Sequence, residues 1–377
     1  MPHNILYIIA LTCIPKLSRR NALDIHKHLG SLISSLFTGS RETILSQQPD
    51  FPIAVLNLIL THRENSLSRA EQEIQFIHKH DIQCLCYGQK DYPQRLVDCD
   101  DAPLVLYYKG TANLNCTYSI CMVGTRKCTE YGKDLCQKLT KGLGSLRPDT
   151  LIVSGLAYGI DIHSHKGALA AGMKTIAVLA HGLDRIYPLS HRNIAKDILQ
   201  QGGLITEYMS GTTPERGNFI CRNRIIAGLS DACIVVESAS KGGSLITAQI
   251  AQDYGRDVLS VPGRVNDPYS QGCNQLIKNN IAALITQPED ILLALNWPTA
   301  LVEKEIKSRP TEMELFSNLS KEETLLIHTL QGNDGKQINQ IVIDSNLPVY
   351  QVTALLFELE MKGIVRLMSG GRYHLVS

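Results

Sequence analysis

The segment spanning residues 151–161 reads LIVSGLAYGID, which predicts a strand, a glycine-containing turn and the start of a helix. The apolar run Leu151–Val153 is short and continuous, as expected of a parallel strand buried on both faces. Gly155 and Gly159 follow it and let the backbone turn tightly. Because similar runs recur along the middle of the chain, we expect an α/β fold with a Rossmann-like, doubly wound parallel sheet.

Six further apolar runs alternate with segments of helix length: Ser119–Val123, Thr175–Leu179, Leu204–Glu207, Ala232–Val236, Val258–Val261 and Ala282–Ile285. We assign all seven runs to a middle domain over residues 81–297. Residues 1–75 lack strong strand signals, and the spacing of their apolar residues predicts a small N-terminal domain of short amphipathic helices. Residues 298–319 are charged and polar, which predicts a linker.

Residues 320–377 predict a C-terminal winged-helix domain. Three helical segments precede a hairpin, and these elements are Glu322–Leu330, Ile338–Ile343, Val349–Met361, Ile364–Met368 and Arg372–Val376. A third helix that reads DNA should be basic, yet this one carries Glu358 and Glu360, and only Lys362 near its end. This charge pattern favours a protein-contact or regulatory role for the domain.

The composition limits the class of protein. A chain of 377 residues that is 44% hydrophobic is long and apolar enough for two or three domains with buried cores. Its longest near-apolar stretch, Ile5–Ile14, is too short to cross a bilayer and lacks the flanks of a secretory signal. Eleven cysteines without a Cys-x-x-Cys pair favour free thiols in a reducing cytoplasm over disulfides or a zinc site.

The net charge of +1 excludes a broad basic surface but not a nucleic-acid partner. Between Ser119 and Ala300 there are 18 basic and 15 acidic residues, a surplus of only three. Any anion-binding site must therefore depend on a few basic side chains that are focused at one place.

Five glycine-rich turns follow predicted strands, at residues 124–126, 154–161, 181–184, 241–244 and 262–264. Because the carboxyl ends of parallel strands share one edge of the sheet, these turns should converge on one rim. Glycine lets the backbone approach an anion, and the helix N-termini that follow favour phosphate. Neither a Gly-x-Gly-x-x-Gly sequence after the first strand nor a Gly-Lys-Ser/Thr loop is present, so the pattern differs from both nucleotide-binding fingerprints.

The segment at residues 219–229 reads FICRNRIIAGL and combines an aromatic residue with Arg222, Asn223 and Arg224. Arg216 precedes it by one turn. Arginine suits phosphate oxygens and an aromatic face can stack on a base, so the segment is a candidate DNA contact. The alternative is a structural helix whose arginines are solvated or pair with Asp231 or Glu207.

A metal site is disfavoured, and we expect neither a metal nor a cofactor. His163 and His165 stand two apart, which places them on different faces of a helix. We expect Asp161 to cap the helix after Gly159. His181 and His191 are then polar rim or surface residues.

Together these motifs resemble the DNA-processing protein A family. The resemblance covers Asp91 to about Leu295 and includes Gly-Thr-Arg at 124–126, Ser-Gly-Leu-Ala-x-Gly-Ile-Asp at 154–161, Phe-x-x-Arg-Asn-Arg at 219–224 and Lys-Gly-Gly-Ser at 241–244. The flanking regions resemble the family's helical domain, with a helix-hairpin-helix-like element, and its winged-helix unit. This chain has Tyr158 where members often carry Lys or Arg, and His181 where many have Gly.

The resemblance implies a non-catalytic cytoplasmic protein. Such a protein binds single-stranded DNA, forms a homodimer and loads the RecA recombinase during natural transformation and homologous recombination. The DNA- or phosphate-binding residues implied are Gly124, Thr125, Arg126, Ser154, Gly155, Tyr158, Gly159, His181, Gly182, Arg216, Phe219, Arg222, Asn223, Arg224, Lys241, Gly242, Gly243, Ser244 and Thr247.

Two other functions stay open at this point. A nucleotide phosphoribohydrolase on a related fold would use Glu237 and Asp161 as acid and base. A winged-helix transcription factor with a ligand-sensing domain would instead bind duplex DNA. For the dimer, we expect a patch at Leu276, Ile277, Ile281 and Leu284, with ordinary core packing as the alternative.

Overall fold

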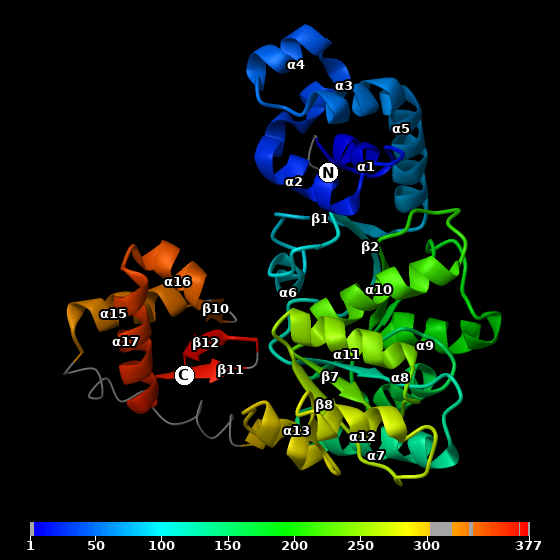
Figure 1. The fold of residues 1–377 in the computed structure, drawn as a ribbon, viewed down its shortest axis with the longest axis vertical. Coiled ribbons are helices and arrows are strands. Elements are labelled where there is room, and N and C mark those ends of the chain that lie inside the picture. Colours follow the sequence, from blue (N-terminus) through cyan, green and yellow to red (C-terminus); the bar gives the residue numbers. More distant parts are fainter. Residues whose placement is uncertain (1–3, 302–318, 332–334, 369, 376–377) are drawn as a thin grey trace. The chain divides into compact units, whose positions relative to one another are not determined.

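A computed structural model describes residues 4–301, 319–331, 335–368 and 370–375 (Figure 1). The chain divides into two compact units, each built from separate stretches of sequence. The first comprises Met1–Asn115, Gly155–Ala157 and Thr175–Leu229, and the second comprises Cys116–Ser154, Tyr158–Lys174 and Ser230–Ser377.

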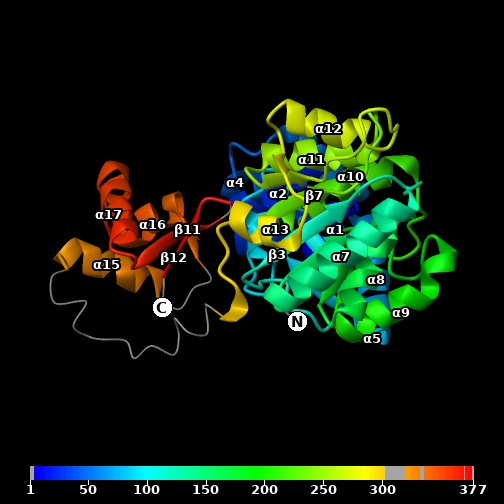
Figure 2. The same cartoon turned by 90° about the horizontal axis from the view of Figure 1, so that it is seen from below.

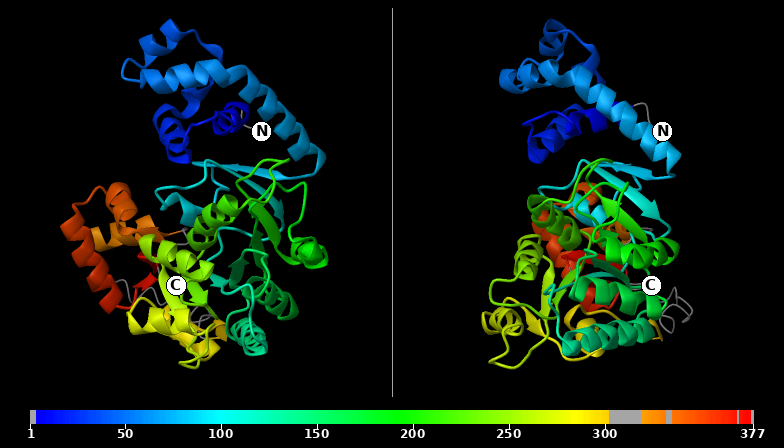
Figure 3. Two further views of the ribbon diagram at one scale, coloured as in Figure 1. Left: turned by 45° about the vertical axis from the view of Figure 1, so that its right-hand side comes forward. Right: turned by 90° about the vertical axis from the view of Figure 1, so that its right-hand side faces the viewer.

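The first unit begins with a group of helices: α1 (Ile5–Thr12), α2 (Arg19–Leu29), the 3-10 helix η1 (Gly30–Ser34), α3 (Ser35–Thr38), α4 (Arg41–Gln47) and α5 (Ile53–Lys79). Helices α1 and α3 pack on α5, the longest of them (Figures 1 and 3). Ser18 caps α2 by accepting a hydrogen bond from the Asn21 backbone N–H, at 3.1 Å. The expected short helices are present, but α5 has 27 residues and extends beyond residue 75.

The rest of the first unit contains four strands in the order β1-β2-β6-β5, which are β1 (Gln83–Cys86), β2 (Val105–Gly110), β6 (Gly203–Thr206) and β5 (Thr175–Val178). The pair β5 and β6 is parallel, whereas β2 is antiparallel to both β1 and β6. The sheet is therefore mixed. The strands β1 and β2 were not predicted from the sequence, because neither is followed by a long helix. The helical elements here are α6 (Gln94–Val97), η2 (Leu189–His191), α9 (Arg192–Gln201) and α10 (Arg216–Gly228).

The second unit contains five parallel strands in the order β4-β3-β7-β8-β9. They are β3 (Ser119–Val123), β4 (Leu151–Ser154), β7 (Ala232–Val235), β8 (Asp257–Ser260) and β9 (Ala283–Leu284). Every residue of β3, β4 and β7 is buried, which explains the continuous apolar runs. The helices are α7 (Glu130–Leu146), α8 (Ile160–Ala170), α11 (Gly243–Asp253), α12 (Gln271–Lys278) and α13 (Pro288–Ala294).

The second unit is doubly wound, as expected. Helices α7 and α8 cover one face of its strands and α11 and α12 the other (Figure 2). The connections leave β3 and β7 in opposite directions along the sheet, so the topological switch lies between these two strands. Open α/β sheets bind ligands at the carboxyl ends of the strands at such a point.

The C-terminal part of the second unit is a winged helix with its own core. Its elements are α15 (Lys321–Leu330), β10 (Lys336–Gln337), α16 (Ile338–Ser345), α17 (Val349–Met361), β11 (Val365–Met368) and β12 (Arg372–Leu375). Leu326, Ile341 and Leu356 are fully buried in that core. The three predicted helices and the hairpin are confirmed, although Val376 and most of the predicted linker lie outside the described residues. The short strand β10, which pairs with β12, was not predicted.

All eleven cysteines are free thiols, as the sequence indicated. Among the described residues, no helix is both long and apolar enough to cross a membrane.

Candidate nucleic-acid interface

The turn after β3 carries Gly124, Thr125 and Arg126. The Thr125 backbone N–H donates to the Glu237 carbonyl at 2.7 Å, and the Thr125 carbonyl accepts from the Ile160 N–H at 3.2 Å. A side chain at Gly124 would clash, because a Cβ there would lie 2.3 Å from Cγ1 of Ile160. The turns after β3 and β7 and the residues from Tyr158 onward after β4 therefore meet in the second unit, which confirms the predicted convergence for three of the five turns, and the Arg126 side chain is exposed.

Glu237 is a buried carboxylate that ties two of these turns together. Its Oε2 accepts from the Thr129 backbone N–H at 2.9 Å, and its Oε1 accepts from the Thr129 hydroxyl at 2.5 Å. Thr129 is the N-cap of α7, where the helix dipole favours a negative charge. Gly132 is required beside it, because a Cβ there would lie 2.3 Å from Oε2. This geometry gives Glu237 a structural task.

The turn after β7 forms a second lip. Gly242 is the N-cap of α11, and Lys241 and Gly243 are exposed beside it. Ser244 and Thr247 are buried instead, and the Ser244 hydroxyl donates to that of Ser238 at 2.8 Å. An exposed lysine at a helix N-terminus is suited to hold an anion.

The turn after β4 presents Tyr158 to solvent with half of its surface exposed. Gly159 has a φ of +77°, and a Cβ there would lie 2.0 Å from the Thr125 carbonyl oxygen. Ser154 is buried and donates to the Met122 carbonyl at 2.7 Å. The expectation that Asp161 caps α8 is wrong. Gly159 is the N-cap because its backbone conformation turns the chain there, and Asp161 lies inside the first turn.

In the first unit, Arg222 is buried. Its guanidinium donates to the Val178 carbonyl at 2.8 Å, and a Cβ at Gly155 would lie 1.7 Å from its Nη1 atom. Gly155 is therefore needed to make room for Arg222, which ties α10 to the end of β5.

Arg224 is also buried. It pairs with Glu207 and donates to the Asp101 carbonyl. Arg19 of α2 binds the same carboxylate at 3.1 Å. The sequence left open that an arginine of this segment pairs with Glu207 or Asp231 in a structural helix. For Arg224 the pairing with Glu207 is confirmed. Asp231 instead accepts from the Ser119 backbone N–H at 2.9 Å.

The exposed part of α10 lies at its beginning. Arg216 is exposed, and Phe219 and Asn223 are half-buried. The Phe219 ring lies 5.8 Å from that of Tyr187, a residue with 47% of its surface exposed. We did not assign Tyr187 to the site, nor Tyr131, which is 57% exposed in the first turn of α7. Both lie outside the glycine-rich turns and the segment at residues 219–229, and their aromatic character was the available signal.

His181 lies inside the protein. One ring nitrogen contacts the Gly182 carbonyl at 2.9 Å, and the other accepts from the Tyr187 N–H at 3.2 Å. Burial lowers the pKa of His181. The side chain thus holds the loop of Gly182 as a neutral imidazole.

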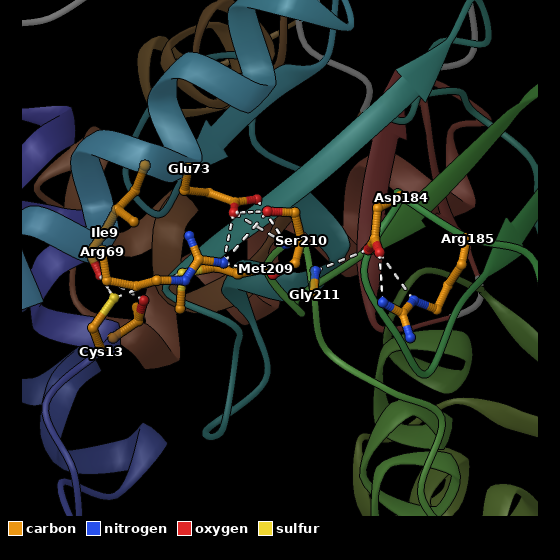
Figure 4. Close-up of polar contacts among 10 residues, drawn as sticks. Ile9, Cys13, Arg69, Glu73, Asp184, Arg185, Met209, Ser210 and Gly211 are labelled. Atoms are coloured by element: carbon orange, nitrogen blue, oxygen red, sulfur yellow. Dashed lines mark hydrogen bonds and ion pairs between the residues drawn. The ribbon is translucent and has the colours of Figure 1, made fainter.

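The loop that leads into α10 is clamped by α5 (Figure 4). Glu73 is buried and accepts from the Ser210 backbone N–H at 3.0 Å and from its hydroxyl at 2.6 Å. Arg69 donates to the Ser210 carbonyl at 2.6 Å. The Gly211 N–H donates to Asp184 at 3.0 Å. The N-terminal helices thereby fix the chain just before Arg216.

Neither the metal alternative nor the complete dimer patch gains support. Among the described residues, no group of three His, Cys, Asp or Glu side chains could hold an ion. In the proposed dimer patch, Leu276 is buried and Ile277 and Ile281 are half-buried, which leaves Leu284 on β9 exposed.

The sequence and fold match known proteins closely. The family model described as DNA recombination-mediator protein A matches residues 83–296, and that of the DprA winged helix domain matches residues 317–371. Protein Smf of Synechocystis is 32% identical over 370 residues, which cover 89% of this chain and 90% of that protein. The chain belongs to the DNA-processing protein A family.

One further relative and two solved structures extend this result. Protein Smf of Escherichia coli is 32% identical over 83% of this chain and 86% of its own length. The X-ray structure of DNA processing protein A from Streptococcus pneumoniae matches with a TM-score of 0.64 at 33% identity, over 77% of this chain and 97% of that one. A Helicobacter pylori family member, described by its single-stranded DNA binding mode, matches with a TM-score of 0.51 at 30% identity, over 56% and 94%.

Proposed function

We propose that this family member binds single-stranded DNA at the rim formed by the turns after β3 and β7. The observation that carries the proposal is the pairing of exposed Arg126 and Lys241 with rigid glycine turns at the topological switch. The turns are held by buried hydrogen bonds of Glu237 and Ser238, so the strand would meet a preformed surface. The Helicobacter pylori relative, known for such binding, supports this choice of ligand.

The aromatic side chains near these two regions suggest how the bases are bound. Tyr131 and Tyr158 in the second unit and Tyr187 in the first expose ring surface on which any base can stack, and the half-buried Phe219 lies beside Tyr187. Binding through phosphates and stacking carries little sequence preference. We therefore propose two patches, the rim in the second unit and the beginning of α10 in the first, without base-specific readout.

The protein acts in this proposal by binding rather than by catalysis. The carboxylates of the phosphoribohydrolase alternative serve other purposes, because Glu237 is bound to Thr129 and Asp161 is buried in the first turn of α8. The family resemblance supports a cytoplasmic role in natural transformation and recombination, with RecA loading on the bound strand.

A homodimer is part of the same proposal. The edge strand β9 of the second unit carries Leu284, which is 51% exposed, and is the most accessible part of the predicted patch. Leu284→Arg should reduce the mass measured by light scattering from dimer to monomer. A dimer that persists in this variant would exclude the patch.

Fluorescence anisotropy with a labelled oligothymidine and with a duplex of equal length tests the DNA proposal. We expect tighter binding of the single strand, and Arg126→Ala or Lys241→Ala should weaken it about tenfold, since each loses a charge-assisted phosphate contact. Lys138→Ala is the matched control, because Lys138 is exposed in the middle of α7 and away from the turns. Equal affinity of all three variants and the parent chain would exclude the rim.

A further inference from the structure

Helix α17 of the winged unit is apolar on two opposite faces. One face packs Val352, Leu356 and Leu359 into the core. The other exposes Tyr350, Phe357 and Met361, whose surfaces are 76%, 64% and 75% accessible. Because these three residues are seven and four positions apart, they form one continuous stripe along the helix. A stripe of three large apolar side chains in water indicates a contact surface rather than ordinary exposure.

The charged side chains of α17 itself are acidic. Helix α17 contains Glu358 and Glu360 and no lysine or arginine. The helical period places the two carboxylates on opposite flanks of the stripe. Lys362, which follows the helix, is already paired with Glu323 at 2.6 Å. In winged helices that bind DNA, this helix enters the major groove between the phosphate backbones and is basic, so an acidic helix is unsuited to nucleic acid.

We propose that α17 docks a basic amphipathic helix of a protein partner. The partner would pack leucine, isoleucine or phenylalanine side chains between Tyr350, Phe357 and Met361. Its lysine or arginine side chains would lie against Glu358 and Glu360. This combination is the usual pattern of helix recognition, in which apolar anchors give affinity and flanking charges set the preference among partners.

The test uses the full chain and two synthetic 18-residue helical peptides with the same leucine face. One peptide carries lysine at the flanking positions and the other carries glutamate. Titration calorimetry should show at least tenfold tighter binding of the lysine peptide. Phe357→Ser and Met361→Ser should each weaken that binding about tenfold. The matched control Leu293→Ser removes an apolar side chain of α13 that is 82% exposed, and should leave binding unchanged.

Charge reversal makes the test independent of the apolar contacts. The double variant Glu358→Lys/Glu360→Lys should prefer the glutamate peptide. Three outcomes would overturn the proposal. They are equal binding of both peptides by the parent chain, a loss of affinity for duplex DNA in Phe357→Ser, or a reduced mass of Phe357→Ser in light scattering. The second would show a DNA-reading helix, and the third a contact between copies of this chain.

Discussion

Two pairs of basic residues were both expected from the sequence to bind DNA, yet one pair is exposed and the other is buried. Arg126 and Lys241 are exposed on glycine turns of the second unit, whereas Arg222 and Arg224 are buried in the first. The buried arginines bind the Val178 carbonyl and the Glu207 carboxylate. The comparison teaches that an arginine in a sequence segment with the signature of a DNA contact can serve the scaffold instead. The two pairs should therefore respond differently to substitution, as the following predictions describe.

The largest expected effect follows from removing a buried charge. Arg224→Ala leaves the Glu207 carboxylate paired with the partly exposed Arg19, and should lower the free energy of unfolding by about 3 kcal/mol. Urea denaturation measures the change. Arg216→Ala, on the exposed turn of the same helix, should change it by no more than about 0.5 kcal/mol. A similar decrease in the free energy of unfolding in both variants would show that the buried ion pair of Arg224 does not stabilise the fold.

The next effect concerns the link between the turns of the second unit. Glu237→Ala leaves the Thr129 N–H and hydroxyl without their acceptor and should cost about 2 kcal/mol of stability. Thr129→Ser keeps the hydroxyl, which donates to Glu237 and accepts from the Gly132 N–H, and should cost less. The same purified protein should release no free base from nucleoside monophosphates. Turnover that disappears in Glu237→Ala would instead establish the phosphoribohydrolase alternative.

A smaller effect is expected from pH. Burial holds the pKa of His181 below its usual value of 6.5, so the unfolded chain takes up a proton first as the pH falls. Stability should be constant above about pH 6.5 and decrease below it, and His26 adds in the same direction. His181→Gln should flatten the decrease in denaturation curves between pH 7.5 and 5.5. An unchanged slope would mean that His181 titrates alike in both states.

Sequence reasoning found the elements that repeat a simple physical pattern. Buried parallel strands such as Ser119–Val123 are continuously apolar, and the three helices of the winged-helix domain repeat apolar residues with the helical period. Both kinds of element were therefore predicted correctly. The antiparallel strand Gln83–Cys86 has no such pattern and was missed. The burial of Arg222 could not be predicted, because it depends on where the Val178 carbonyl and Gly155 lie in space. The same limit applies to Glu237, which became a structural residue only when Thr129 was seen beside it.

The most direct test of the central claim is the salt dependence of single-stranded DNA binding by the double variant Arg126→Ala/Lys241→Ala. Each phosphate contact to a single strand contributes about 0.7 to the slope of log affinity against log salt concentration. If both side chains bind phosphates, the magnitude of this negative slope should be smaller by about 1.4 in the double variant. The free energy of unfolding should stay within about 0.5 kcal/mol of the parent value. An unchanged slope and affinity would contradict the assignment of the rim as the DNA-binding site.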